Sequence, residues 1–270
     1  MTNFIQSPSD ITSELPHIYW CLTGPLAFLP MHAAGLYSEE NSGLGNKLSD
    51  LAVSSYIPSL ISLLNGHKSE KGKGKTNQML AVALPAESRL PGAGIEIEKL
   101  KVHIEKFPLL ELLESKATIE AVTTGLKKSS WVHFACHGIQ DISNPTESAL
   151  LLAEHSQLTL STISNLLLPH AQIVFLSACQ TATGDKDLAE EAIHLAAGML
   201  LAGFRGAIGT MWSISDHDAP EVADSVYAHI FKDNNPDAKQ AAYALHVAIR
   251  KLQEENTSYF SWVPFIHLGV

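Results

Sequence analysis

Residues 131–138, WVHFACHG, and residues 173–181, IVFLSACQT, are two short β-branched and apolar runs that each end at a reactive side chain. The first run ends at His137, which Gly138 follows, and the second ends at Cys179. Apolar runs of this length predict central strands of a parallel sheet, because such strands are buried on both faces. Ligands bind such sheets at the carboxyl ends of the strands. The pattern therefore predicts that His137 and Cys179 meet at one edge of the sheet.

The residue types at these two strand ends predict nucleophilic catalysis. A thiol beside an imidazole loses its proton near neutral pH and becomes a thiolate nucleophile. A single cysteine in an apolar strand is usually a buried small hydrophobe, but the ordered pair of strand ends favours a catalytic role for Cys179 and His137. Cys136 is predicted to be a core residue, because adjacent strand residues point to opposite faces. His133 is predicted to be a strand or core histidine.

Composition and charge narrow the class of protein. The chain has 270 residues, of which 46% are hydrophobic, and a net charge of −10 without a large basic patch, so neither nucleic acid nor anionic membrane is an expected partner. Its three cysteines are too few for a disulfide framework and suit a reducing compartment. No apolar run reaches the roughly 18 residues of a membrane span, and residues 1–10 lack the features of a signal peptide. A cytoplasmic protein is therefore expected.

The remaining sequence alternates predicted strands and helices, which is typical of a doubly wound α/β fold. We expect a sheet of about six mostly parallel strands with helices on both faces, in one domain spanning residues 1–270. In residues 47–64 the apolar positions have helical spacing, and a helix is expected to begin near Tyr56 or Pro58. The other expected strands are residues 78–84, 117–122, 206–212 and 262–269, and the other expected helices are residues 95–106, 188–203, 218–231 and 237–254.

Several ordered motifs resemble the CHAT family, which has a caspase-like fold and is related to separase. In caspases the catalytic histidine precedes the cysteine by about 50 residues, and here Cys179 follows His137 by 42 positions. The resemblance covers roughly residues 20–270, and the chain carries none of the tetratricopeptide repeats that often precede such a domain. The matching motifs are HFACHG (133–138), LSACQTATGD (176–185), EEAIHLAAGMLLAGFRGAIGTMWSISD (190–216), FIHLG (265–269) and GPLAFLPMHAAG (24–35).

The resemblance implies a cysteine peptidase with a Cys-His dyad. Cys179 would attack the scissile carbonyl, and His137 would activate the thiol and then protonate the leaving amine. The backbone N–H groups of Gly138 and Cys179 would form the oxyanion hole. A substrate peptide would add as a strand beside the segment that follows residues 206–212, the fifth of the expected strands. The residues expected to border this cleft are Trp212, Ser213 and Ile214.

The acidic residues near the expected cleft predict a substrate preference, and the spacing of the histidines bears on metal binding. Asp141 and Asp216 follow strands near the expected cleft, and either would favour Arg or Lys at the position before the cut (P1). No metal site is expected, because the 13 histidines are scattered and neither H-E-x-x-H nor C-x-x-C occurs. No cofactor is expected.

Three classes of function remain open. The resemblance favours an endopeptidase that cuts a protein partner, for which a defence or cell-death effector such as a gasdermin-like protein is a candidate. It also implies control by a regulatory repeat domain or partner protein. A catalytically latent caspase-like interaction module is the second class, which the intact dyad disfavours. The third is a thiol acyl hydrolase, which would have a closed deep pocket in place of an open strand-pairing cleft.

Overall fold

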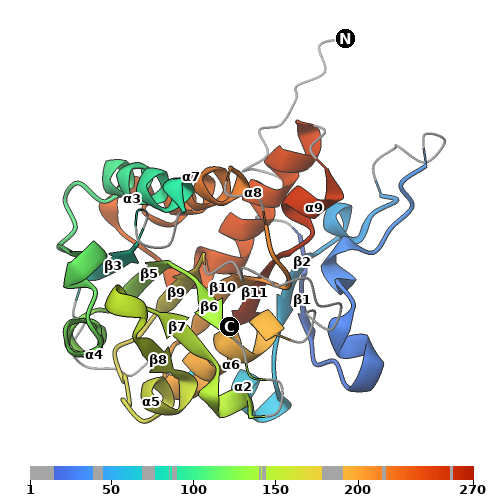
Figure 1. Cartoon of the computed structure of the whole chain (residues 1–270). Coiled ribbons are helices and arrows are strands. Elements are labelled where there is room, and N and C mark those ends of the chain that lie inside the picture. Colours follow the sequence, from blue (N-terminus) through green and yellow to red (C-terminus); the bar gives the residue numbers. More distant parts are fainter. Residues whose placement is uncertain are drawn as a thin grey trace.

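An eight-stranded sheet crosses the centre of the computed structural model, in the order β1-β2-β11-β10-β9-β5-β3-β4 (Figure 1). The structure describes residues 15–38, 45–68, 77–84, 86, 90–139, 141, 144–177, 191–214, 217–255 and 258–270. The strands are β1 (His17–Trp20), β2 (Val53–Tyr56), β3 (Met79–Ala83), β4 (Leu109–Leu113), β5 (Trp131–Ala135), β9 (Ile173–Leu176), β10 (Gly206–Thr210) and β11 (Phe265–Gly269).

The direction of the strands confirms the expected mostly parallel sheet, although the sheet has eight strands and not about six. From β4 through β3, β5 and β9 to β10, every neighbouring pair is parallel. β11 is antiparallel to β10, while β2 and β1 run parallel to β11. The carboxyl ends of β5, β9 and β10 therefore lie at one edge of the sheet, and the beginning of β11 joins them there.

Helices cover both faces of the sheet, as expected. In Figure 1, α3 (Pro91–His103), α7 (Asp218–Ile230) and α8 (Ala241–Glu254) lie on one side, and α4 (Ile119–Lys128), α5 (Leu160–Ser164) and α6 (Glu191–Ala202) lie on the other. Alternation along β5 explains the two layers, because successive side chains point to opposite faces. Trp131 packs with α7 and α8, whereas Val132 and Phe134 pack with α4 and α6.

Two of the sequence predictions for individual elements are wrong. Residues 117–122 begin a helix and not a strand, because the Thr118 side chain accepts a hydrogen bond from the N–H of Ala121 and so caps α4. Val122 and Leu126 then face the core at helical spacing. The strand of this region is β4, just before it. The helix expected near Tyr56 or Pro58 is α2 (Leu60–Lys68), which begins two residues after Pro58, and a start at Tyr56 is wrong because residues 53–56 form β2.

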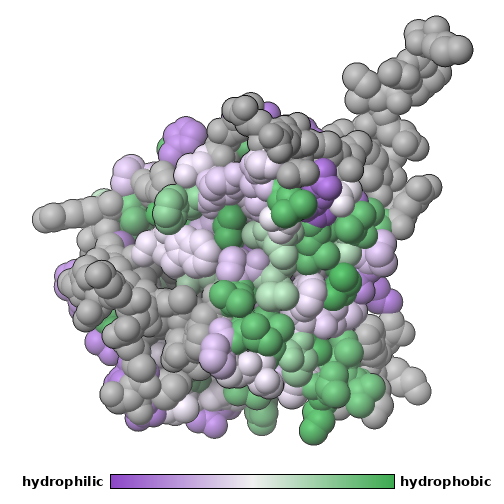
Figure 2. Space-filling view, turned by 90° about the vertical axis from the view of Figure 1, so that its right-hand side faces the viewer, coloured by the Kyte–Doolittle hydropathy of each residue, from purple (hydrophilic) through white to green (hydrophobic). Residues whose placement is uncertain are grey.

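The outer edge of the sheet carries exposed apolar side chains. Figure 2 shows apolar residues gathered on the side of the molecule where β1 forms the last strand. The segment after β1, coloured blue in Figure 1, exposes about half of the side chains of Leu26, Leu29 and Leu36. Exposed apolar side chains beside an edge strand are a feature that proteins often cover with a partner. Within the described ranges, no helix is both long and apolar enough to cross a bilayer.

Gly203 ends α6 in a conformation that other residues avoid. Its φ of 120° is left-handed, and a β-carbon at this position would lie 2.6 Å from the carbonyl oxygen of Leu168. We expect Gly203→Ala to lower the free energy of unfolding by about 1–3 kcal/mol, because strain and backbone contact both oppose the added methyl group. Urea unfolding monitored by circular dichroism measures the change. Gly209→Ala is the matched control, since its β-carbon would meet nothing closer than 3.8 Å. Equal midpoints for the two variants would contradict the expectation.

Candidate active site

His137 lies between the end of β5 and the start of a small antiparallel sheet. This sheet consists of β6 (Gly138–Ile139), β7 (Ala149–Leu151) and β8 (Gln157–Thr159). The carbonyl oxygen of His137 accepts a hydrogen bond of 2.8 Å from the N–H of Leu151. The backbone of His137 is therefore held between the central sheet and the small sheet. The residue itself is half-buried.

The pairing of β6 with β7 decides where the backbone of Gly138 points. Gly138 lies opposite Leu150, one position beyond the hydrogen-bonded pair of His137 and Leu151. Hydrogen-bonded and non-hydrogen-bonded pairs alternate in an antiparallel ladder. The N–H of Gly138 consequently points away from β7, and this buried residue directly follows the imidazole.

The end of β9 lies beside the end of β5. The two strands are parallel neighbours, with Phe134 opposite Leu176. The N–H of Ser177 donates a hydrogen bond of 2.8 Å to the carbonyl oxygen of Phe134, which extends the pairing past the last residue of β9. Ser177, two positions before Cys179, therefore lies next to the strand that leads to His137. Cys179 itself lies outside the described residues, as does Asp216.

Cys136 is a core residue, as predicted. Its side chain is fully buried and packs with the helices on the α4 and α6 face. Burial raises the pKa of its thiol to about 12, and the nearby Glu96 carboxylate contributes to the rise. A thiol with so high a pKa is a poor nucleophile at neutral pH.

The segment after β10 borders the same edge of the sheet. The N–H of Met211 donates to the carbonyl oxygen of Pro264 at 2.8 Å, which ties this segment to the start of β11. Trp212 is half-buried and packs against the apolar clusters of both faces, and its Nε1 atom is buried without a partner among the described residues. Ser213 is exposed, and Ile214 is half-buried.

Asp141 takes part in the structure of its own loop. Its Oδ1 atom accepts a hydrogen bond from the N–H of Asn144 at 2.9 Å, and its N–H donates to Oγ of Ser148. The carboxylate thus lies on the loop that connects β6 to β7, beyond His137 in the chain.

The sequence analysis missed Glu96, a buried acid beneath these strand ends. It lies on α3, is 2% exposed, and accepts a hydrogen bond of 2.8 Å from Oγ of Ser177. Its other oxygen is 3.1 Å from Nε2 of His133. The signal was present in the sequence, because Glu96 falls on the apolar face of α3 formed by Ala93, Ile97 and Leu100. His133 is buried within β5, as predicted.

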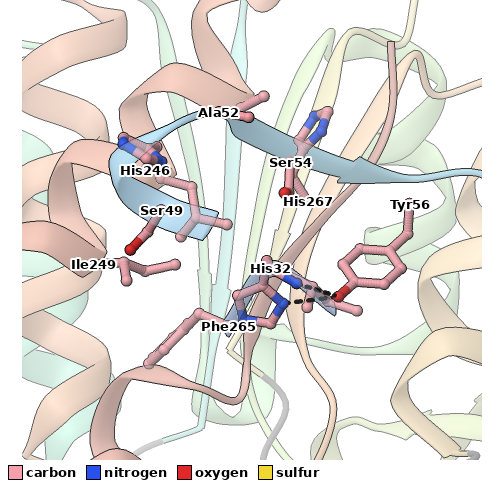
Figure 3. Close-up of a pocket in the computed structure, with 12 residues that line it drawn as sticks. His32, Ser49, Ala52, Ser54, Tyr56, His246, Ile249, Phe265 and His267 are labelled. Carbon is pink, nitrogen blue, oxygen red and sulfur yellow. Dashed lines mark hydrogen bonds between the residues drawn. The ribbon is translucent and has the colours of Figure 1, made fainter. Parts of the chain in front are cut away.

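A second polar cluster surrounds a cavity of about 20 Å³ between β2, β11 and α8 (Figure 3). His32 bonds through Nδ1 to the hydroxyl group of Tyr56 at 2.8 Å and through Nε2 to the carbonyl oxygen of Val263 at 2.9 Å. Burial lowers the pKa of His32 to about 4, that of His246 to about 4 and that of His267 to about 3. These histidines are therefore neutral structural groups. Among the described residues, no three His, Cys, Asp or Glu side chains converge as metal ligands would.

The comparisons with known proteins agree with the fold. Gingipain R (RgpB), an Arg-specific cysteine proteinase, has a TM-score of 0.57 at 14% identity, over 84% of this chain and 56% of that chain. The complex of the Porphyromonas gingivalis RgpB pro- and mature domains has a TM-score of 0.60 at 13% identity, over 95% and 64%. The separase–securin complex of Saccharomyces cerevisiae has a TM-score of 0.53 at 15% identity, over 83% and 14%.

At identities this low, the structural similarity shows the fold alone. That fold is the expected caspase-like architecture. The chain spans less than two thirds of the length of each of these structures. No curated protein matches its sequence. The family model of the CHAT domain, however, matches residues 3–270. The chain therefore belongs to the CHAT domain family.

Proposed function

We propose that this protein is a cysteine endopeptidase in which His137 and Cys179 form the catalytic dyad. The observation that carries the proposal is the parallel pairing of β5 with β9, continued by the hydrogen bond between Ser177 and Phe134. Because β5 and β9 are neighbours, the strand that leads to His137 and the strand that leads to Cys179 end next to each other at one edge of the sheet. Membership of the CHAT family and the fold of two cysteine proteases support the same chemistry.

The proposed steps follow from the residue types. The Cys179 thiolate attacks the scissile carbonyl carbon, and His137 donates its proton to the leaving amine. The N–H of Gly138, which points away from β7, and the N–H of Cys179 donate to the oxyanion. Water then hydrolyses the acyl-enzyme, with His137 as the base.

We propose that the substrate is a protein segment that binds along residues 211–214. Trp212 and Ile214 offer apolar contacts there, and Ser213 is exposed beside them. Asp216 or Asp141 would favour a basic P1 residue, and the gingipain neighbour is described as Arg-specific. A gasdermin-like effector is a candidate substrate. The pro-domain and securin found with two of the neighbours support regulation by a partner protein or repeat domain.

Cleavage profiling of a diverse peptide library by mass spectrometry tests the proposal. We expect the native chain to cut after Arg or Lys, and Cys179→Ala to cut nothing, because this variant lacks the proposed nucleophile. Cys21→Ala is the matched control, since Cys21 is an exposed thiol and this variant should cut the same peptides as the native chain. Cleavage that persists in Cys179→Ala would exclude this nucleophile.

A further inference from the structure

Four buried polar side chains form a connected cluster beneath the candidate active site. Glu96 comes from α3, His133 from β5, Ser177 from the end of β9 and Tyr227 from α7, and each is no more than 5% exposed. Ser177 donates its hydroxyl proton to Oε1 of Glu96 at 2.8 Å. Nδ1 of His133 lies 2.9 Å from the hydroxyl oxygen of Tyr227, and its Nε2 lies 3.1 Å from Oε2 of Glu96. The cluster thus joins four elements that are distant in the sequence.

A purely structural role explains this cluster poorly. Burial of a carboxylate costs several kcal/mol before any compensation, and apolar residues of similar volume often stabilise a core better than a buried ionic cluster does. The contacts are also imperfect for stability, because Oε2 of Glu96 and Nε2 of His133 are close but not aligned for a hydrogen bond. Glu96 has an electrostatic effect on its neighbours. Burial is the main cause of the raised pKa values of Cys136 and Tyr227, and the charge of Glu96 is the second cause in both.

The position of the cluster in the chain suggests what it does. Ser177 precedes Cys179 by two residues, and His133 precedes His137 by four. Glu96 contacts both, and so it connects the end of β9 with the middle of β5, the two strands that lead to the proposed dyad. Glu96 is carried by α3, which packs beside α7 on one face of the sheet (Figure 1). This packing holds the helix that presents the carboxylate to the strands.

We propose that Glu96 is a positioning residue, which holds the end of β9 through Ser177 and β5 through His133 and thereby sets the placement of Cys179 against His137. The inference rests on the proposed function, because the dyad is what is being placed. Nucleophilic catalysis is sensitive to such placement, and a misplacement of about 1 Å costs about 100-fold in rate.

Ser177→Ala and Glu96→Leu each remove the connection between α3 and the end of β9. We expect each to lower kcat for a cleaved peptide by about tenfold while KM changes less than about twofold. The double variant should lose no more than Glu96→Leu alone, because that substitution already removes the hydrogen bond from Ser177. Glu96→Gln keeps an oxygen acceptor for Ser177 and should retain most of the activity. Thermal unfolding of Glu96→Leu should show some loss of stability, because the buried Ser177 and His133 lose their partner. The kinetic constants are therefore compared at a temperature at which circular dichroism shows each variant to be fully folded, which separates positioning from folding.

Ser55→Ala is the matched control. Ser55 is also a fully buried serine, and its hydroxyl oxygen lies 2.7 Å from Nδ1 of His267, at the other end of the sheet. This variant should lose stability and keep kcat. A loss of kcat equal to that of Ser177→Ala would overturn the proposal, as would full activity of both Ser177→Ala and Glu96→Leu.

Alkylation of Cys179 by iodoacetamide between pH 5 and 9, mapped by mass spectrometry, tests the placement without peptide cleavage. We expect Ser177→Ala to lower the rate at pH 6 severalfold relative to the native chain, because a thiol displaced from its imidazole is protonated there. If the native chain cuts no peptide but this shift occurs, the proposed function fails and the positioning role stands. If peptides are cut and neither kcat nor the alkylation profile changes in Ser177→Ala, the positioning role fails alone.

Discussion

Replacement of His137 by Ala should lower kcat/KM for peptide cleavage by about 10²- to 10⁴-fold, which is the usual contribution of a general acid and base. The side chain is half-buried at the edge of the sheet, so its loss should leave the fold intact. The pH dependence of Cys179 alkylation provides a second readout. If the proposed dyad holds the thiol as an ion pair with the His137 imidazole, alkylation in the native chain should continue below pH 7. In His137→Ala it should follow the ordinary thiol pKa of about 8.5.

His229→Ala is the control for this variant. His229 lies in the last turn of α7 and interacts only weakly with Gln240, at 3.4 Å. We expect it to retain native kcat/KM and the native alkylation profile. A His137→Ala protein that keeps activity within a few-fold of the native chain would mean that another residue is the base.

The central part of the fold could be predicted from sequence because its signals are local. β5 and β9 are runs of consecutive buried residues, and each reads as a strand on its own. β2 has the sequence VSSY, in which two serines interrupt the apolar pattern, so no strand was predicted there. Ser55 is buried between β1 and β11 and contacts His17 and His267, which are distant in the sequence. No local pattern contains that information.

The same distinction separates the predicted from the missed part of the site. His137 and Gly138 end an apolar run, and their place after β5 follows directly from it. The role of Glu96 depends on Ser177, 81 residues away, and on His133. A glutamate on the apolar face of a helix could have indicated a buried partner, but only the packing of α3 on the sheet identifies which partner it is.

Acid should destabilise the fold between pH 6.5 and about 4 through the three histidines around the cavity of Figure 3. Their folded-state pKa values are lowered, mainly by burial, to about 4 for His32 and His246 and about 3 for His267. In the unfolded chain they titrate near 6.5. Below that pH the unfolded chain binds protons that the folded protein does not, so the free energy of unfolding falls as the pH falls. Each histidine contributes about 1.4 kcal/mol per pH unit in this window.

His246→Leu isolates one of these contributions. The Nε2 atom of His246 is buried and has no hydrogen-bond partner among the described residues. Replacement by leucine therefore breaks no hydrogen bond of Nε2 within that part of the chain. Burial is the main cause of its lowered pKa; Arg250 lowers it further, and Asp50 opposes the change. Urea unfolding at pH 7, 6, 5 and 4.5 should show a slope shallower by about 1.4 kcal/mol per pH unit in the variant. Parallel slopes for His246→Leu and the native chain would mean that His246 is protonated in the folded state at these pH values.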